Sequence, residues 1–446
     1  MSRYSNRYIL RFWAPLASTW LMMAAEGPFL AAVIARLPDP KYNLAAHGVA
    51  FAFAVLIEAP VIMLMSASTA LVEDAVSYRK LRNFANALNV ASTALLLGVL
   101  VPSVFDFLMR TLIGLPDEIA DLTYGALWLF LPWPAAIGLR RFVQGVLIRS
   151  GRTRLVAIGT AIRLTSMACA ATTLYLLTDL PGAWVGAASL STAVITEAIA
   201  ARWMASTAIR ELLRGPAQVN RDTTPLGYRR ISHFYFPLLL TSIIGLTVHP
   251  MLTFFMGRAP APVESLAVFP VVHALSFIFR ALGLSFQDAA IALLGRRNEH
   301  LRELARFGAG LGLAATAGLS AIAFTPLAGF WFITVSGLTP ELASFALTPT
   351  RILAIIPLLS VLLSFQRAIL IQVRRTRPIT VATAIEVAGI AGVFAAAAWG
   401  AGMVGATAAF LSYVVGRTLS TAYLATRVRR VLRAGARAVP GSGLGT

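Results

Sequence analysis

The feature that most constrains the fold of this chain is a succession of apolar segments, each long enough to cross a lipid bilayer as a helix. The hydrocarbon core of a bilayer is about 30 Å thick, and a helix needs about 20 apolar residues to span it. Twelve segments of the 446-residue sequence reach this length. The sequence therefore predicts an all-α polytopic membrane protein with twelve transmembrane helices. The predicted spans are residues 12–36, 45–71, 84–109, 119–147, 155–178, 182–205, 232–257, 265–294, 304–332, 342–372, 378–399 and 402–427.

The composition excludes the main alternatives to a membrane protein. Apolar residues make up 58% of the chain and charged residues 13%, whereas soluble domains contain about 45–50% and about 25%. A water-soluble enzyme of this size needs more polar surface than that. The single cysteine, Cys169, cannot form an internal disulfide. The first apolar segment is longer than the core of a signal peptide and contains Glu26-Gly27-Pro28, so we interpret it as the first span.

The distribution of basic residues predicts the orientation in the membrane. If twelve spans put both termini on one side, that side carries 29 of the Lys and Arg residues, with Arg140 and Arg141 counted in one of its loops. The other side carries four: Arg36, Lys41, Arg110 and Arg258. The positive-inside rule then predicts that both termini are cytoplasmic. We expect a multi-pass protein of the cell (inner) membrane. The net charge of +19 indicates orientation in the lipid bilayer rather than binding to nucleic acid.

The chain also contains an internal repeat. Pro, Arg and aromatic positions recur at an ungapped offset of 222, and further matches lie at offsets of 223 and 219. Apolar composition alone does not produce such coincidences of Pro, Arg and Phe. The matches include Pro28 with Pro250, Arg36 with Arg258, Thr160-Ala161-Ile162 with Thr383-Ala384-Ile385, and, at 219, Val185-Gly186-Ala187 with Val404-Gly405-Ala406.

An even number of spans in each half predicts two parallel repeats related by an axis along the membrane normal. Such a pair forms two lobes, and rocking of the lobes about a shared cleft gives alternating access. We predict an N-terminal six-helix lobe over residues 1–205 and a C-terminal six-helix lobe over residues 232–427. A cytoplasmic linker, 206–231, joins them, and a basic tail, 428–446, follows.

Ionisable residues inside the predicted spans are the main candidates for function. A charge at the centre of a membrane helix costs about 2.5–3.5 kcal/mol on insertion scales, so each needs a partner or a wet cavity. Arg202 and Asp288 lie near cytoplasmic ends, where they can act as anchors. The residues well inside the spans are Glu26, Glu58, Glu197, Glu386, Arg163, Arg280, Arg351, Arg417, His249 and His273.

The repeat relates some of these charges in pairs of opposite sign. Arg163 corresponds to Glu386, and for these two we favour structural pairing inside each lobe. Glu58 corresponds to Arg280, and we predict that both line the cleft and form a salt bridge when the lobes close. The alternative is that each is paired inside its own lobe. His273 precedes Arg280 by seven residues, two helical turns, so the two can share a ligand.

Several motifs of enzymes and ATP-driven pumps are missing from the sequence. It contains no GxxxxGK[ST], no HExxH and no Cys/His zinc spacing, and its loops are short. We therefore expect no cofactor, no metal site and no enzymatic activity. Transport would be driven by a gradient of the substrate or of a coupling proton or sodium ion, in a protein that we expect to be a monomer.

Five short stretches are similar to one family of transporters. They are Phe12–Pro15 running to Glu26-Gly27, His47–Ala50 running to Ala59-Pro60, Phe269–His273, Gly145–Leu147 and Val404–Thr407. With the repeat, they resemble the progressive ankylosis protein family within the MATE-like multidrug/oligosaccharidyl-lipid/polysaccharide exporter superfamily. The resemblance implies export of citrate, nucleotide or pyrophosphate. Glu26 and His273 match the pattern of the family, whereas Arg280 lies about one turn before the position of the family's arginine.

These features predict a secondary-active exporter of small organic or phosphate-bearing anions. The candidate substrate-binding residues are Arg280, His273, Arg351 and Arg163, and the candidates for gating or proton coupling are Glu58 and Glu26. A flippase for an anionic lipid-linked intermediate is the first alternative. A cation or drug antiporter is the second, favoured by the two glutamates and disfavoured by the arginine excess. An integral-membrane enzyme comes last, because only the outer Asp117, Glu118 and Asp121 are clustered acids.

Overall fold

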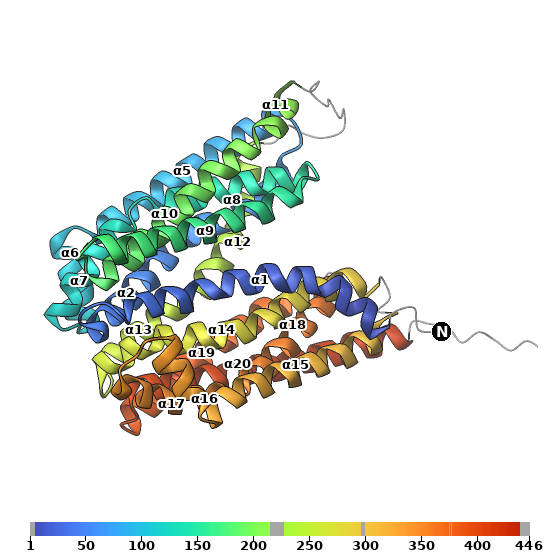
Figure 1. Ribbon diagram of the computed structural model, residues 1–446. Coiled ribbons are helices and arrows are strands. Elements are labelled where there is room, and N and C mark those ends of the chain that lie inside the picture. The colour runs from blue at the N-terminus through green and yellow to red at the C-terminus, as the bar shows by residue number, and fades with distance from the viewer. Residues whose placement is uncertain (1–4, 215–226, 296–298, 374, 376, 438–446) are drawn as a thin grey trace, which may run out of the picture.

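The computed structural model describes residues 5–214, 227–295, 299–373, 375 and 377–437, and over these ranges the chain forms helices and no strand (Figure 1). The structure confirms an all-α membrane fold. The helices of the first half are α1 (Asn6–Ile34), α2 (Pro40–Ile57), α3 (Ala59–Ile62), α4 (Leu64–Leu71), α5 (Ala75–Val99), α6 (Pro102–Asp106), the π-helix η1 (Phe107–Ile113), α7 (Asp117–Leu129), α8 (Trp133–Arg149), α9 (Thr153–Leu177), α10 (Gly182–Met204) and α11 (Ser206–Arg214).

The second half repeats this order with fewer breaks. Its helices are α12 (Tyr228–Leu246), α13 (Val248–Gly257), α14 (Pro262–Leu293), α15 (Leu301–Phe324), α16 (Leu327–Gly329), the π-helix η2 (Phe330–Val335), α17 (Pro340–Leu353), α18 (Ile356–Gln372), α19 (Arg377–Phe394), the π-helix η3 (Ala395–Gly400) and α20 (Gly405–Arg437).

The predicted spans correspond to these helices, although several spans are bent. In the described part of the chain eight helices are long and apolar enough to cross a membrane, or up to eleven if each of three bent pairs is one span. The bends are 53° between residues 57 and 59, 73° between 99 and 102, and 41° between 129 and 133. Each bend has a proline at the start of the following helix, where a missing N–H is tolerated.

Most of the last predicted span, residues 402–427, falls within α20, a 33-residue helix that is not among the eight described helices long and apolar enough to cross a membrane. This helix continues to Arg437, so the first part of the predicted tail is helical. The rest of the tail, 438–446, lies outside the described residues. In the predicted linker, residues 206–214 form α11, and residues 215–226 lie outside the described part. The lobe boundaries stay a prediction.

The helices form two groups whose ribbons diverge toward the end of the molecule where the N-terminus lies (Figure 1). The helix α1 lies along α14, in the second group. Two tryptophans of α1 hold it there: Trp13 Nε1 donates to Ser285 Oγ over 2.9 Å, and Trp20 Nε1 donates to Asp288 Oδ2 over 3.2 Å. The same helix also contacts α9 and α10 of the first half, so α1 connects the two groups.

Matching backbone geometry in the two halves confirms the internal repeat. Asp39 has a φ of 50° and Ala261 a φ of 52°, and both are N-caps directly before a proline. A left-handed conformation is uncommon for residues other than glycine. Its occurrence at two positions 222 residues apart shows that both halves make the same turn between their first and second spans.

The structure corrects the offset that the sequence indicated for the last span of each half. The backbone N–H of Ala183 donates to Asn43 Oδ1, and that of Ala406 donates to Ser265 Oγ, both over 2.9 Å. Asn43 and Ser265 are 222 residues apart, and Ala183 and Ala406 are 223 apart. The Val-Gly-Ala match at an offset of 219 is therefore a coincidence of small apolar residues and does not relate equivalent positions.

The start of α5 is fixed by a capping box on the basic side of the molecule. Asp74 Oδ1 accepts the backbone N–H of Ser77 over 2.7 Å, and Ser77 Oγ accepts the backbone N–H of Asp74 over 2.9 Å. The bond from Ser77 lowers the pKa of the Asp74 carboxyl below its ordinary value. This capping ends the turn after α4 and directs the chain back into the membrane.

Candidate functional site

The six residues predicted to form the site fall into separate places. Glu26 and Arg163 are bonded to each other, and Arg280 is bonded to His273. Glu58 lies in the first half and does not contact Arg280 in this structure. Arg351 contacts neither group: its Nε donates to the carbonyl of Ala323 over 3.3 Å.

The pair of Glu26 and Arg163 joins α1 to α9. Arg163 Nη2 donates to Glu26 Oε2 over 2.5 Å, and the two side chains are 11% and 10% exposed. The second oxygen, Glu26 Oε1, is buried and has no hydrogen-bond partner in the described structure. Pairing removes most of the cost of two charges at membrane depth. In this conformation the guanidinium of Arg163 is therefore occupied by protein.

A second ion pair in the first half was missed by the sequence analysis. Arg140 Nη1 donates to Glu197 Oε2 over 2.7 Å, and Gln144 Nε2 donates to Glu197 Oε1 over 3.1 Å. Glu197 is completely buried. The sequence analysis counted Arg140 and Arg141 with a cytoplasmic loop. That assignment is wrong, because α8 continues to Arg149 and carries both arginines inside the lobe.

The Arg140–Glu197 pair is expected to stabilise the fold. Arg140→Leu leaves a buried carboxylate without its cation, a change that costs about 3–5 kcal/mol in folding stability. We expect a large fall in the thermal unfolding temperature of the purified protein. The double variant Arg140→Leu with Glu197→Leu removes both charges and is expected to recover most of the loss. A single variant as stable as the native protein would contradict this role.

Glu58 lies at the break between α2 and α3, opposite the start of α8. Its Oε2 accepts a hydrogen bond from Trp133 Nε1 over 2.6 Å, and the side chain is buried. Arg141 and Arg140 act on it electrostatically. Arg141 forms no ion pair within the described residues, and its Nε has no partner there. The first half therefore contains a buried carboxylate beside a cation that no carboxylate contacts directly.

Arg280 lies in the middle of α14 and is surrounded by rings instead of carboxylates. Its Nη1 lies 3.3 Å from His273 Nε2. The guanidinium lies over the rings of Tyr413 and Phe277, at 4.9 and 5.8 Å from the centroids. No ion pair to Arg280 is formed by the residues that the structure describes. Aromatic rings stabilise a cation without neutralising it, so Arg280 keeps a positive charge available to a ligand.

The two histidines of this group lie side by side. The rings of His249 and His273 are 4.6 Å apart at an angle of 81°, and Phe269 contacts both. His273 bonds to Arg280 through Nε2, so its ring is oriented by the arginine. The predicted proximity of His273 and Arg280 is confirmed, and His249 joins them from α13.

Tyr413 fixes the position of Arg280 from the other side. Its hydroxyl accepts a hydrogen bond from Arg417 Nη2 over 2.9 Å, and Arg417 in turn pairs with Glu386 over 2.7 Å. Glu386 is thus paired inside its own lobe, as the sequence predicted. Tyr413 was not a candidate in the sequence because it carries no charge. The one indication of its position was its spacing of four residues from Arg417, which puts both side chains on the same helix face.

Contacts between the two halves close the end of the molecule opposite the start of α1, which the sequence predicts to be the outer end. Arg258 donates to the carbonyls of Thr111 and Leu112 over 2.6 and 2.7 Å. Arg36 donates to the carbonyls of Thr334 and Val335 over 2.7 and 3.0 Å. We call these two contacts the outer clasps.

The repeat relates the outer clasps to each other. The two arginines are 222 residues apart, and the carbonyls that they bind, at the ends of η1 and η2, are 223 apart. Each clasp joins one half of the chain to the other. Nearby, Lys41 on α2 bonds to Glu264 on α14 over 2.5 Å and adds an ion pair between the halves.

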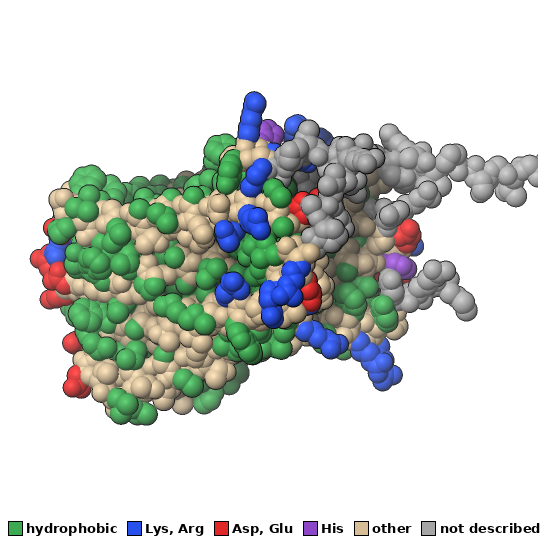
Figure 2. Space-filling model, turned by 90° about the horizontal axis from the view of Figure 1, so that it is seen from above, with side chains coloured by type: hydrophobic (Ala, Val, Ile, Leu, Met, Phe, Trp, Pro, Cys, Tyr) green, Lys and Arg blue, Asp and Glu red, His purple; other side chains and the backbone are tan. Residues whose placement is uncertain are grey.

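Charge separates along the molecule. Seen from above, Lys and Arg gather toward the end where α1 begins, whereas Asp and Glu lie at both ends, with a group of them at the opposite end (Figure 2). The acidic end includes Asp106, Asp117 and Asp121, which all bind Arg110. This asymmetry agrees with the orientation that the sequence predicts. Among the described residues no group of three or more His, Cys, Asp or Glu forms a candidate metal site.

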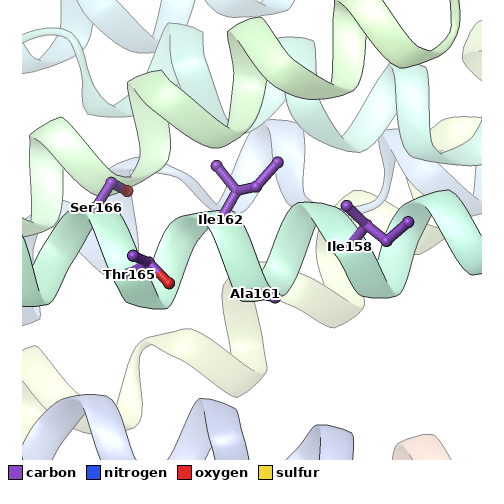
Figure 3. A pocket seen from close by; sticks show the side chains of 5 residues that line it. All are labelled: Ile158, Ala161, Ile162, Thr165 and Ser166. Atoms are coloured by element: carbon purple, nitrogen blue, oxygen red, sulfur yellow. The ribbon is translucent and has the colours of Figure 1, made fainter.

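A cavity of about 410 Å³ lies against α9 and contains no ionisable group (Figure 3). Its lining comes from one helix, with Ile158 and Ile162 on one side and Thr165 and Ala161 on the other. An apolar wall on a single helix provides no charge for recognising an anion. The arginines described above are therefore the better candidates for a site.

Comparison with solved structures defines the class of fold. A multidrug resistance MATE family transporter of the MOP superfamily, in an inward-facing conformation, matches with a TM-score of 0.68 and 15% identity over 95% of this chain and 96% of that chain. The lipid II flippase MurJ, in an inward closed conformation, matches with a TM-score of 0.69 and 13% identity over 93% of this chain and 87% of that chain.

A third match is a MOP superfamily transporter from Pyrococcus furiosus, described as having a binding pocket of reverse polarity that suggests a different function. Its TM-score is 0.66 at 15% identity, over 97% of both chains. No protein-family model and no curated protein sequence matches the chain. At these identities the matches establish the fold. The protein is a multi-pass membrane protein with a MATE-like fold.

Proposed function

We propose that this protein is a secondary-active transporter of small anions that works by alternating access between its two lobes. The observation that carries the proposal is Arg280, a membrane-depth arginine that contacts His273, Tyr413 and Phe277 and forms no ion pair with any described carboxylate. A guanidinium in such a place binds carboxylate or phosphate through strong charge-assisted hydrogen bonds. Arg141 in the first half is a further membrane-depth cation that forms no ion pair among the described residues.

The fold supports the transport cycle. Transporters and a flippase share it, and the two compared above were solved in inward-facing and inward closed conformations. In this chain the outer clasps hold the lobes together at one end, while the ribbons diverge at the other (Figure 1). We infer an inward-facing state of a cell-membrane protein with cytoplasmic termini. The resemblance to the progressive ankylosis family favours citrate, nucleotide or pyrophosphate as the anion, exported from the cell.

Proteoliposomes test this proposal. Vesicles that contain the protein are expected to take up labelled citrate, pyrophosphate or nucleotide faster than empty vesicles. Uptake of an organic cation with no uptake of any anion would contradict the proposal and favour the cation antiporter. Because MurJ shares the fold, a fluorescent anionic lipid-linked sugar is included. Movement of that lipid between leaflets without anion uptake would favour the flippase.

Glu58 is the proposed site of proton coupling, with Glu26 as the second candidate. Glu58→Gln keeps the acceptor oxygen for Trp133 but cannot lose or gain a proton. We expect this variant to bind the anion with native affinity and to lose most of the pH dependence of transport between pH 5.5 and pH 8, since a fixed neutral group no longer titrates. Transport rates across this pH range check the prediction, and an unchanged pH profile would exclude Glu58.

A further inference from the structure

A second cavity lies among the helices of the first lobe, and none of the six predicted site residues lines it. It has a volume of about 200 Å³ and lies between α5, α8 and α10. Its polar lining consists of Tyr78, Arg82, Asn86 and Asn89 from α5 and Arg202 from α10. The remaining lining, which includes Leu139 and Phe142 of α8, is apolar. Unlike the cavity on α9, this one combines an apolar floor with two cations.

The two arginines have no acidic partner in the described structure. Arg82 Nη2 donates to the side-chain carbonyl of Asn83 over 3.3 Å, and Arg202 forms no hydrogen bond or ion pair within the described part of the chain. Both guanidiniums interact electrostatically with the hydroxyl of Tyr78, so both charges lie near this side chain. Asn89 Oδ1 is buried against Gly138 of α8 and has no hydrogen-bond partner in the described structure. The cavity therefore presents two guanidiniums that no protein carboxylate neutralises.

The place of the cavity in the fold indicates what reaches it. The helix α5 lies at the edge of the first group that is farther from the second group (Figure 1), and α10 packs on α8 and α9. The helix α5 begins and α10 ends at the basic end of the molecule, where Lys and Arg gather on this face (Figure 2). Trp203, next to Arg202, is 77% exposed. An exposed tryptophan beside arginine is typical of the membrane–water interface.

We propose that this cavity binds the headgroup of an anionic phospholipid of the cytoplasmic leaflet. The lipid phosphate lies between Arg82 and Arg202, and the amide groups of Asn86 and Asn89 bind hydroxyl groups of the headgroup. Basic pockets between helices on the cytoplasmic side suit such headgroups. Val90 and Ile199, 69% and 64% exposed on the same two helices, give the acyl chains an apolar surface to follow. This site does not depend on the proposed transport function.

Native mass spectrometry of the full-length protein tests the proposal with phosphatidylglycerol and phosphatidylcholine as the two probes. We expect phosphatidylglycerol to remain bound after delipidation and phosphatidylcholine to be lost. Arg82→Gln with Arg202→Gln is expected to weaken phosphatidylglycerol binding by about tenfold or more. Both arginines are exposed, so the double variant is expected to fold.

The matched control is Arg429→Gln with Arg433→Gln, which removes two exposed arginines from α20 at the same end of the molecule. It is expected to bind phosphatidylglycerol as the native protein does. Glycerol 3-phosphate is added as a competitor to distinguish a lipid from a free phosphate. Displacement of the lipid by this soluble anion at low millimolar concentration would overturn the lipid assignment. Equal retention of phosphatidylglycerol and phosphatidylcholine by the native protein would overturn the proposed site. Equal loss of phosphatidylglycerol binding in the two double variants would overturn it as well.

Discussion

Arg280→Ala is expected to abolish anion uptake by proteoliposomes. The substitution removes the one guanidinium that α14 places among His273, Tyr413 and Phe277, and nothing described in that group replaces its charge. Charge-assisted hydrogen bonds contribute about 1.5–3 kcal/mol each. Loss of about 2 kcal/mol or more lowers anion affinity by about 30-fold or more. Titration of the purified variant with pyrophosphate and citrate measures this loss directly.

A second arginine of the same half provides the control. Arg351 binds the carbonyl of Ala323 and lies over the ring of Phe324 at 5.9 Å, away from Arg280. Although the sequence predicted a substrate contact for it, its partners in this structure belong to the end of α15. We expect Arg351→Ala to keep most of the anion uptake. Native uptake by Arg280→Ala, with or without an effect at Arg351, would end the assignment of the site.

Removal of both outer clasps is expected to shift the protein toward a state that is open at the outer end. Arg36 and Arg258 each donate two hydrogen bonds from one half of the chain to the other. If each exposed arginine stabilises the closed outer end by about 1 kcal/mol, Arg36→Ala with Arg258→Ala changes the ratio of the two states by about 30-fold. Each single variant is expected to give about half of this free-energy change, because the clasps are equivalent under the repeat.

Spin labels report the shift as a distance between the lobes. Cys169 is exposed and is first replaced by serine, and a pair of cysteines is then placed at the outer ends of α7 and α17. We expect the double variant to populate longer outer distances than the native protein. Arg110→Ala is the matched control: this outer arginine binds Asp106, Asp117 and Asp121, all within its own half. Arg110→Ala is expected to give the same distances as the native protein. If the double variant also gives the native distances, the clasps do not hold the outer ends of the lobes together.

The sequence predicted the helical fold and the repeat because both depend on local and periodic features. The span lengths follow from bilayer thickness, and the recurrence of Pro28 and Arg36 at Pro250 and Arg258 is visible without coordinates. The sequence also predicted that His273 and Arg280 share a face, since seven residues make two turns of one helix. These inferences need only the geometry of a single helix.

The partners of the buried charges were harder to predict because they depend on how each helix is rotated against its neighbours. The sequence did not indicate that Glu26 would bind Arg163, and it left Tyr413 unnoticed because a tyrosine carries no charge. Arg140 was misassigned for a different reason. It lies near the end of a predicted span, where a count of basic residues treats it as part of the loop, although α8 carries it inward to Glu197.

Counterflow is the measurement that tests the central claim most directly. Proteoliposomes are loaded with a high concentration of unlabelled anion and diluted into a low concentration of the same anion in labelled form. A carrier that alternates between two faces exchanges the two, so we predict that the label accumulates transiently above its external concentration, and that Arg280→Ala vesicles show no accumulation. Label that only equilibrates, at the same rate with and without the protein, would contradict an alternating-access anion transporter.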